Sequence, residues 1–170
     1  MILGAVLAGG QARRFGSDKA QALYRGERMI DRVTAALSAQ CDVVVMCGRI
    51  EHGFASIPDW PAPALGPLGG LAAALRHAET RGFAHVLSAG VDVPNLPRDM
   101  VAMLTGEGAA IVASQPVIGL WPVDAFAGLE SFLNDGGRGL YRFAERISAR
   151  QVTPPVALLN VNRPEDLPQD

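Results

Sequence analysis

The hydrophobic positions of this chain follow two patterns that alternate along its length. Short continuous apolar runs are typical of buried strands, and stretches with apolar residues every three or four positions are typical of amphipathic helices. The runs predict strands over residues 2–8, 42–47, 54–57, 85–89, 109–113, 116–121 and 157–160. The periodic stretches predict helices over residues 28–39, 68–80, 98–104, 124–134 and 140–149, with a final helical turn at 164–167.

Strands that alternate with helices predict an α/β fold with a mostly parallel sheet covered on both faces. The runs over 109–113 and 116–121 are close enough in sequence to form a hairpin or a bent pair. No internal repeat or linker divides the chain, so we expect a single domain over residues 1–170. Ligands of such sheets bind beyond the carboxyl ends of the strands. The segments of interest are therefore residues 8–19, 58–66, 90–95 and 160–164.

Composition and charge exclude several classes of protein. The 170 residues are 49% hydrophobic with a formal net charge of -2, which excludes a disordered chain and a protein that coats nucleic acid. No apolar run is long enough to span a bilayer, so no membrane association is expected. The N-terminal apolar run has no basic residues before it and is typical of a strand, not of a signal peptide. Cys41 and Cys47 form no CxxC pair, which argues against structural zinc and for a reducing compartment, so we expect a cytoplasmic protein.

The loop after the first predicted strand combines glycines with cations. Residues 7–19 read LAGGQARRFGSDK, which contains Arg13, Arg14 and Lys19, the single lysine among 15 Lys and Arg residues. Glycines allow backbone N–H groups to approach a phosphate, and the cations can add charge-assisted hydrogen bonds. The spacing fits neither the Walker A loop nor the GxGxxG fingerprint. An ordinary turn with solvated charges is the alternative interpretation, and the combination of three cations with three glycines favours phosphate binding.

Asp92 is the candidate metal ligand. It follows the strand predicted over residues 85–89, and Pro94 and Pro97 stiffen the chain behind it. Mg²⁺ is commonly held by one or two carboxylates together with phosphate oxygens and water. An aspartate that only caps a turn is the alternative.

A third segment, residues 59–71, begins with Asp59 and places Gly69 and Gly70 at the start of a predicted helix. Glycine there lowers helix propensity. Two explanations remain open at this stage: the close approach of a backbone or flat ring, and tight packing of the helix on the sheet.

Four segments together resemble one enzyme family. LAGGQARRFGSDK at 7–19, LGPLGGL at 65–71, DVP at 92–94 and NVNRPEDL at 160–167 resemble, in order and spacing, the molybdenum cofactor guanylyltransferases. These enzymes join GMP from GTP to molybdopterin and have a three-layer, Rossmann-like (GT-A-like) nucleotidyltransferase fold. LAGG with Asp-Lys is similar to the guanylyl-transferring branch, whereas LAAG with Pro-Lys is more usual in cytidylyl- and sugar-nucleotide enzymes.

The resemblance implies roles for the residues of the first loop. Arg14 and Lys19 would contact the triphosphate and belong to the catalytic set. Four residues would bind the guanine and phosphate end of GTP: Leu7, Ala8, Gly9 and Gly10.

The remaining roles implied by the resemblance fall on the later segments. Asp59 would lie near the nucleotide, and Asp92 would bind both the nucleotide and the catalytic Mg²⁺. Asn160 and Asn162 would lie on the pterin side. The family often has a nucleotide-contacting asparagine where this chain reads Met-Cys-Gly-Arg at 46–49, so backbone groups are expected to replace that contact. The chain is also somewhat short for the family, which suggests that a peripheral element is trimmed.

The activity implied is a Mg²⁺-dependent transfer of GMP from GTP to the terminal phosphate of molybdopterin or Mo-molybdopterin, with release of pyrophosphate. Proteins that deliver or receive the cofactor are further expected partners. Two alternatives differ in class. One is a cytidylyl- or sugar-nucleotide transferase of the same fold, and the other is a non-catalytic module that binds nucleotide or pterin.

Overall fold

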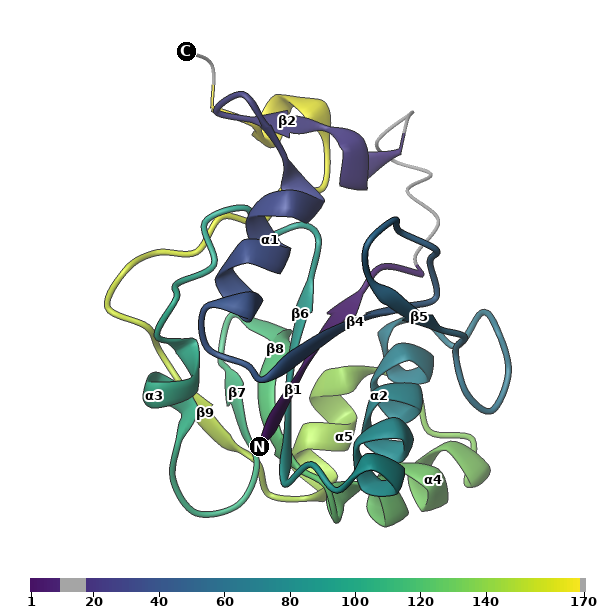
Figure 1. The fold of residues 1–170 in the computed structure, drawn as a ribbon. Helices are drawn as coiled ribbons and strands as arrows, with labels where there is room; N and C mark the ends of the chain where they lie inside the picture. The colour runs from purple at the N-terminus through teal and green to yellow at the C-terminus, as the bar shows by residue number, and fades with distance from the viewer. Residues whose placement is uncertain (10–17, 169–170) are drawn as a thin grey trace.

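The computed structural model describes residues 1–9 and 18–168 as a seven-stranded sheet with helices on both faces (Figure 1). The strands of this sheet are β1 (Ile2–Leu7), β4 (Val43–Cys47), β5 (Ala55–Ile57), β6 (His85–Gly90), β7 (Ala110–Val112), β8 (Gln115–Pro122) and β9 (Arg150–Val152). The helices are α1 (Met29–Ser38), α2 (Pro67–Arg81), α3 (Met100–Leu104), α4 (Ala125–Asn134) and α5 (Leu140–Arg146). No helix among the described residues has the length and apolar character needed to cross a bilayer.

The strand order β5-β4-β1-β6-β8-β7-β9 places β1 inside the sheet. β1 pairs in parallel with β4 and with β6, and β5 is parallel to β4. β8 runs antiparallel to both of its neighbours, β6 and β7, and β9 is parallel to β7. The mostly parallel sheet is therefore confirmed, and the pair over 109–113 and 116–121 is an antiparallel hairpin. Because β1, β4 and β6 are parallel, their carboxyl ends share one edge of the sheet.

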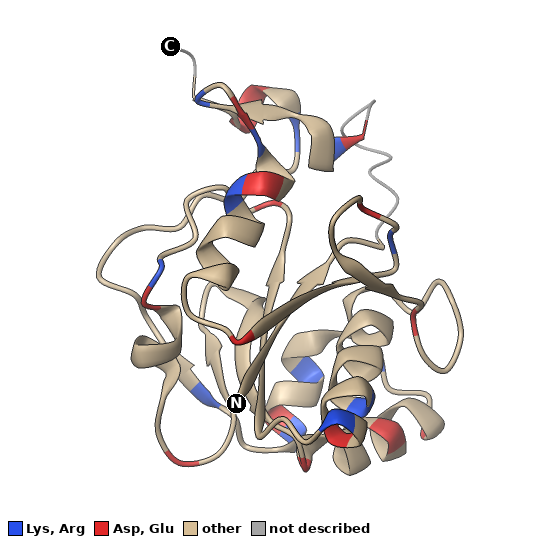
Figure 2. Ribbon diagram, in the orientation of Figure 1, with Lys and Arg blue, Asp and Glu red and all other residues tan. Residues whose placement is uncertain are grey.

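Two apolar layers enclose the sheet. On one face, α2, α4 and α5 pack through residues such as Leu71, Leu129 and Phe143. On the other face, α1 and α3 pack through residues such as Ile30 and Met100. Charged residues lie mostly on the helices and loops, while the central strands are largely tan (Figure 2). This burial on both faces explains why the strands read as continuous apolar runs.

The strand predicted over residues 157–160 is wrong. The structure has no regular element there, and β9 occupies the sheet edge beside β7 instead. Backbone groups here bind side chains and one loop carbonyl instead of a strand backbone: Leu159 N–H donates to Asn95 Oδ1, the Leu159 carbonyl accepts from Gln115 Nε2, and Val161 N–H donates to the Asp92 carbonyl. Leu158 packs against the apolar cluster that includes Leu96, and Leu159 packs against the cluster of Tyr24, Met29 and Val161. Periodicity does not distinguish this burial from that of a strand.

Besides β9, the sequence pattern does not predict three other short elements. They are the one-turn helix η1 (Lys19–Gln21) and the two-stranded hairpin β2 (Leu23–Tyr24) and β3 (Glu27–Arg28). Each is too short to show a period. The final turn η2 (Pro164–Asp166) was predicted and is present.

Candidate active site

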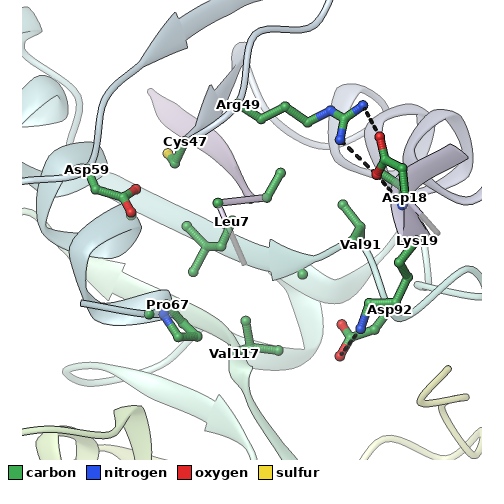
Figure 3. Close-up of a pocket in the computed structure, with 16 residues that line it drawn as sticks. Leu7, Asp18, Lys19, Cys47, Arg49, Asp59, Pro67, Val91, Asp92 and Val117 are labelled. Carbon is green, nitrogen blue, oxygen red and sulfur yellow. Dashed lines mark hydrogen bonds and ion pairs between the residues drawn. The ribbon is translucent and has the colours of Figure 1, made fainter. Parts of the chain in front are cut away.

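A cavity of about 240 Å³ opens at the carboxyl ends of β1, β4 and β6 (Figure 3). This is the edge at which a ligand is expected in a parallel sheet. Among its lining residues are Leu7, Ala8 and Gly9 after β1, Lys19 of η1, Cys47 and Arg49 at the end of β4, Asp59, Gly70 of α2, and Asp92 after β6.

Lys19 and Asp92 meet at one end of this cavity, although they are far apart in the sequence. Lys19 Nζ lies 4.0 Å from Asp92 Oδ2, and the two side chains are 19% and 22% exposed. Lys19 is the first residue of η1, whose N-terminus is capped by Asp18 Oδ1, which accepts a hydrogen bond from Ala20 N–H. A cation and a carboxylate that are both mostly shielded from water, and that face a cavity, are suited to binding a charged ligand.

The carboxylate of Asp92 has the features of a metal ligand. Its Oδ1 atom is buried and finds no hydrogen-bond partner in residues 1–9 and 18–168. Gly90 makes room for it, because a Cβ atom at Gly90 would lie 2.6 Å from Oδ1. A buried carboxylate oxygen without a donor is costly unless a cation binds it. No cluster of three or more His, Cys, Asp or Glu exists within the described ranges, so any divalent ion here would need ligand phosphates and water as well.

Asp59 lies at the other end of the cavity, away from Lys19 and Asp92 (Figure 3). Two glycines lie against its carboxylate. If Gly9 carried a Cβ atom, that atom would lie 3.2 Å from Asp59 Oδ2, and a Cβ atom on Gly48 would lie 2.8 Å from Asp59 Oδ1. Gly48 has a φ of +74, and a Cβ atom there would also lie 2.7 Å from Gly9 Cα, so only glycine fits this close approach of two loops. Burial raises the pKa of the Asp59 carboxyl above its ordinary value. An acceptor of this kind, with open backbone on either side, suits a flat polar ring that carries N–H donors.

The two glycines at the start of α2, Gly69 and Gly70, allow neighbouring groups to approach the helix closely. A Cβ at Gly69 would lie 3.2 Å from Asp59 Cβ, which shows that this glycine lets the aspartate sit against the helix. A Cβ at Gly70 would lie 3.1 Å from Leu7 Cδ2 and 3.2 Å from Cys47 Cβ. Gly70 thus permits tight packing of the helix on the sheet, and it also lines the cavity.

Arg49 is a cavity residue that the sequence reasoning did not select. Its guanidinium makes a bidentate ion pair with Asp18, through Nη1–Oδ1 at 2.9 Å and Nη2–Oδ2 at 2.8 Å. This partner holds the pKa of the Asp18 carboxyl below its ordinary value. One signal was available, because Arg49 ends the 46–49 segment in which the chain departs from the family pattern. The pairing with Asp18 could not be read from the sequence.

A second, wider cavity of about 850 Å³ adjoins the first and shares Gly9, Arg49, Asp59 and Gly66 with it. Its other walls include apolar residues: Ile50, Ile57, Pro58, Pro63 and Ala64. The two cavities together form a continuous concave surface with a charged end at Lys19 and Asp92 and a more apolar end beyond Asp59.

The structure places Asn160 and Asn162 near the Asp92 loop but not among the residues that line either cavity. Asn162 Nδ2 donates to Asn160 Oδ1 at 2.9 Å, and Val161 between them is buried. Val161 N–H donates to the Asp92 carbonyl at 2.8 Å, which ties this segment to the site. Leu7, Ala8 and Gly9 line the first cavity as expected. Gly10, Arg13 and Arg14 lie outside the described residues.

Comparisons with known proteins agree with this geometry. Residues 4–152 match the family model for the MobA-like NTP transferase domain. The chain is 36% identical to a molybdenum cofactor guanylyltransferase of Rhizobium leguminosarum bv. trifolii, a match that covers 98% of this chain and 90% of that protein. It is 37% identical to one of Acidiphilium cryptum, over 86% of this chain and 81% of that protein.

Solved structures share the fold. Molybdopterin-guanine dinucleotide biosynthesis protein A of Archaeoglobus fulgidus has a TM-score of 0.75 at 24% identity, over 98% of this chain and 95% of that one. The 2-C-methyl-D-erythritol 4-phosphate cytidylyltransferase of Thermus thermophilus has a TM-score of 0.74 at 15% identity, over 96% of this chain and 94% of that one. At these identities the structures establish a common α/β nucleotidyltransferase fold and do not choose among nucleotides.

Proposed function

Because this chain belongs to the MobA-like NTP transferase family, with molybdenum cofactor guanylyltransferases among its relatives, we propose that it transfers GMP from GTP to molybdopterin. The observation that carries the proposal is one cavity with a cation and a carboxylate at one end, Lys19 and Asp92, and a second carboxylate, Asp59, at the other. A nucleoside triphosphate has the matching polarity, with a base at one end and phosphates at the other.

In this reaction a terminal phosphate oxygen of molybdopterin forms a bond to the α-phosphorus of GTP. The bond from that phosphorus to the bridging oxygen breaks, and the electron pair leaves with pyrophosphate. The nucleophile is already anionic, so no strong general base is needed. The contribution of the protein is to position the reactants and to neutralise charge.

Lys19, together with Arg14, binds the triphosphate and offsets the charge that grows on pyrophosphate. Asp92, whose Oδ1 is buried without a hydrogen-bond donor among the described residues, would hold Mg²⁺, and the ion would neutralise phosphate charge. Lysine suits this position, because a compact ammonium approaches phosphate oxygens as a point charge. Asn160 and Asn162, on either side of the Val161 N–H that donates to the Asp92 carbonyl, are assigned to the pterin.

Asp59 selects guanine. An ionised carboxylate is an acceptor only, and guanine offers it two adjacent donors, the N1–H and the 2-amino group. Cytosine places the lone pair of N3 next to its single amino group, so the carboxylate would face an acceptor. A base that leaves the buried carboxylate without hydrogen-bond donors binds much more weakly, so the site discriminates strongly between guanine and cytosine. The Gly9 and Gly48 backbones leave space for the purine beside this carboxylate.

The test is pyrophosphate release by the purified protein with molybdopterin, Mg²⁺ and GTP, with CTP, ATP and UTP as competitors. We expect release that requires molybdopterin and prefers GTP. Equal use of CTP would identify a cytidylyl- or sugar-nucleotide enzyme of the same fold, and nucleotide binding without release would identify a non-catalytic module. A cytoplasmic location, and protein partners that deliver or receive the cofactor, stay predictions.

A further inference from the structure

The one-turn helix that carries Lys19 is held at both ends by arginines from other parts of the chain. At its N-terminal side, Arg49 binds the capping residue Asp18 through two nitrogens. At its C-terminal side, Arg28 Nη1 donates to Gln21 Oε1 at 2.9 Å. A single 3₁₀ turn of three residues has little stability of its own, so its orientation depends on such external contacts.

Both arginines bind the same carboxylate, that of Glu51. Arg28 Nη1 lies 2.9 Å from Glu51 Oε1, and Arg49 Nε lies 3.3 Å from Glu51 Oε2. The Glu51 side chain is only 11% exposed, so it is well shielded from solvent. Asp31, in the first turn of α1, binds the remaining side of Arg28 at 2.6 Å. The result is a continuous chain of ion pairs from α1 through the loop after β4 to η1.

We propose that Arg28, Glu51 and Arg49 form a positioning cluster that fixes η1 and thereby aims Lys19 at Asp92 and the triphosphate. This rests on the proposed role of Lys19 as a phosphate contact. Lysine has a long, flexible side chain, so the position of its backbone sets where the ammonium can reach. A displacement of about 1 Å at a reacting group can lower a rate by about 100-fold.

The contacts favour positioning over direct binding of GTP. Arg49 Nε and Nη1 donate to Glu51 and Asp18, and Nη2 lies 2.8 Å from Asp18 Oδ2, so each of its three guanidinium nitrogens already has a carboxylate partner in this chain. Glu51 is not among the described residues that line either cavity, and its negative charge would repel a triphosphate. The role of Glu51 is therefore to join Arg28 and Arg49.

The first experiment uses Glu51→Gln, which keeps the size of the side chain and removes its charge. We expect kcat for pyrophosphate release to fall by about tenfold or more. Because Glu51 is well shielded, its loss of charge is also expected to lower the melting temperature, so the rate is measured at a temperature at which circular dichroism shows the variant to be folded. Arg146→Ala is the matched control, because it removes an exposed ion pair to Asp135 of 2.9 Å far from the cavity, and it should change nothing.

A double-mutant cycle on GTP affinity shows whether Glu51 acts through Lys19 or weakens GTP binding independently of Lys19. If the cluster acts through Lys19, Glu51→Gln adds no further loss in a Lys19→Ala background. Additive losses would overturn the proposal. So would a normal rate in Glu51→Gln when Lys19→Ala is inactive. A normal rate and affinity in Lys19→Ala itself would refute the phosphate role of Lys19 and the cluster with it.

Arg49→Lys separates positioning from direct contact. Lysine binds phosphate well as a point charge but cannot reproduce the bidentate pair with Asp18 and the third bond to Glu51. We expect Arg49→Lys to lose as much activity as Arg49→Ala. If Arg49→Lys keeps most of the GTP affinity that Arg49→Ala loses, Arg49 binds the nucleotide directly and the positioning role is wrong.

Discussion

Asp92→Asn should have opposite effects on metal-free GTP binding and on metal-dependent turnover. Lys19 Nζ lies 4.0 Å from Asp92 Oδ2, with side chains 19% and 22% exposed. Two unit charges at this distance attract by about 1 kcal/mol in bulk water and by about 4 kcal/mol near a protein surface. Without metal, GTP must take Lys19 from Asp92, and the carboxylate also repels the triphosphate. The lower value alone predicts that Asp92→Asn binds GTP at least about fivefold more tightly when metal is absent.

With Mg²⁺ present, the same substitution should lower the rate of pyrophosphate release by about 100-fold or more, because the charged ligand of the ion is gone. Calorimetric titration of GTP in a chelator measures the first effect, and pyrophosphate release over a range of Mg²⁺ concentrations measures the second. Asp135→Asn, an exposed aspartate paired with Arg146, is the control for loss of one negative charge. Unchanged or weaker metal-free affinity would refute the competition between Asp92 and the triphosphate. An unaltered Mg²⁺-dependent rate would show that the ion is held elsewhere.

Five further predictions concern four single residues. Lys19→Ala should abolish turnover in a folded protein, and Lys19→Arg should not restore it, as measured by pyrophosphate release and circular dichroism. Asp59→Asn should weaken GTP binding but raise the melting temperature at neutral pH. Burial raises the pKa of Asp59 in the folded state, so its charge costs stability above the ordinary pKa of an aspartate, and asparagine removes that cost. In the unmodified protein, GTP affinity should accordingly begin to fall with decreasing pH before an ordinary carboxyl would titrate. Gly48→Ala should cost about 1–2 kcal/mol of stability from its positive φ, and more from contact with Asp59, as measured by chemical unfolding. Ser88→Ala should cost about 1–3 kcal/mol in the same assay, because Trp121 Nε1–H then loses its buried acceptor at 2.9 Å.

The sequence pattern was most reliable where burial alone decides the structure. The strands over β1, β4 and β6 are covered on both faces, so their apolar runs are unambiguous. The run over 157–160 is also apolar but forms no strand, because the side chains of Asn95 and Gln115 bind its backbone. Those partners lie far away in sequence, and no local pattern could reveal them. The short elements η1, β2 and β3 depend on tertiary contacts for the same reason.

The sequence predicts which charged residues belong to the site but not how they are packed. Lys19, Asp59 and Asp92 were selected from the sequence, and they line one cavity. The burial of Asp92 Oδ1 and the glycines around Asp59 are properties of packing and required the structure. Arg49 and Glu51 were not selected, because an arginine and a glutamate in a loop are common. Only the ion pairs that join Glu51 to Arg49, and Arg49 to Asp18 at the start of η1, distinguish them.

The position of β1 between β4 and β6 also has a consequence for how the protein is made. Residues 2–7 leave the ribosome before both of their strand neighbours, residues 43–47 and 85–90. At a synthesis rate of about 5–20 residues per second, this apolar strand waits several seconds with an open edge. Open strand edges promote pairing between nascent chains. A truncated chain that ends before His85 would keep that edge permanently and should aggregate, whereas one that includes Gly90 can complete the three-stranded centre of the sheet.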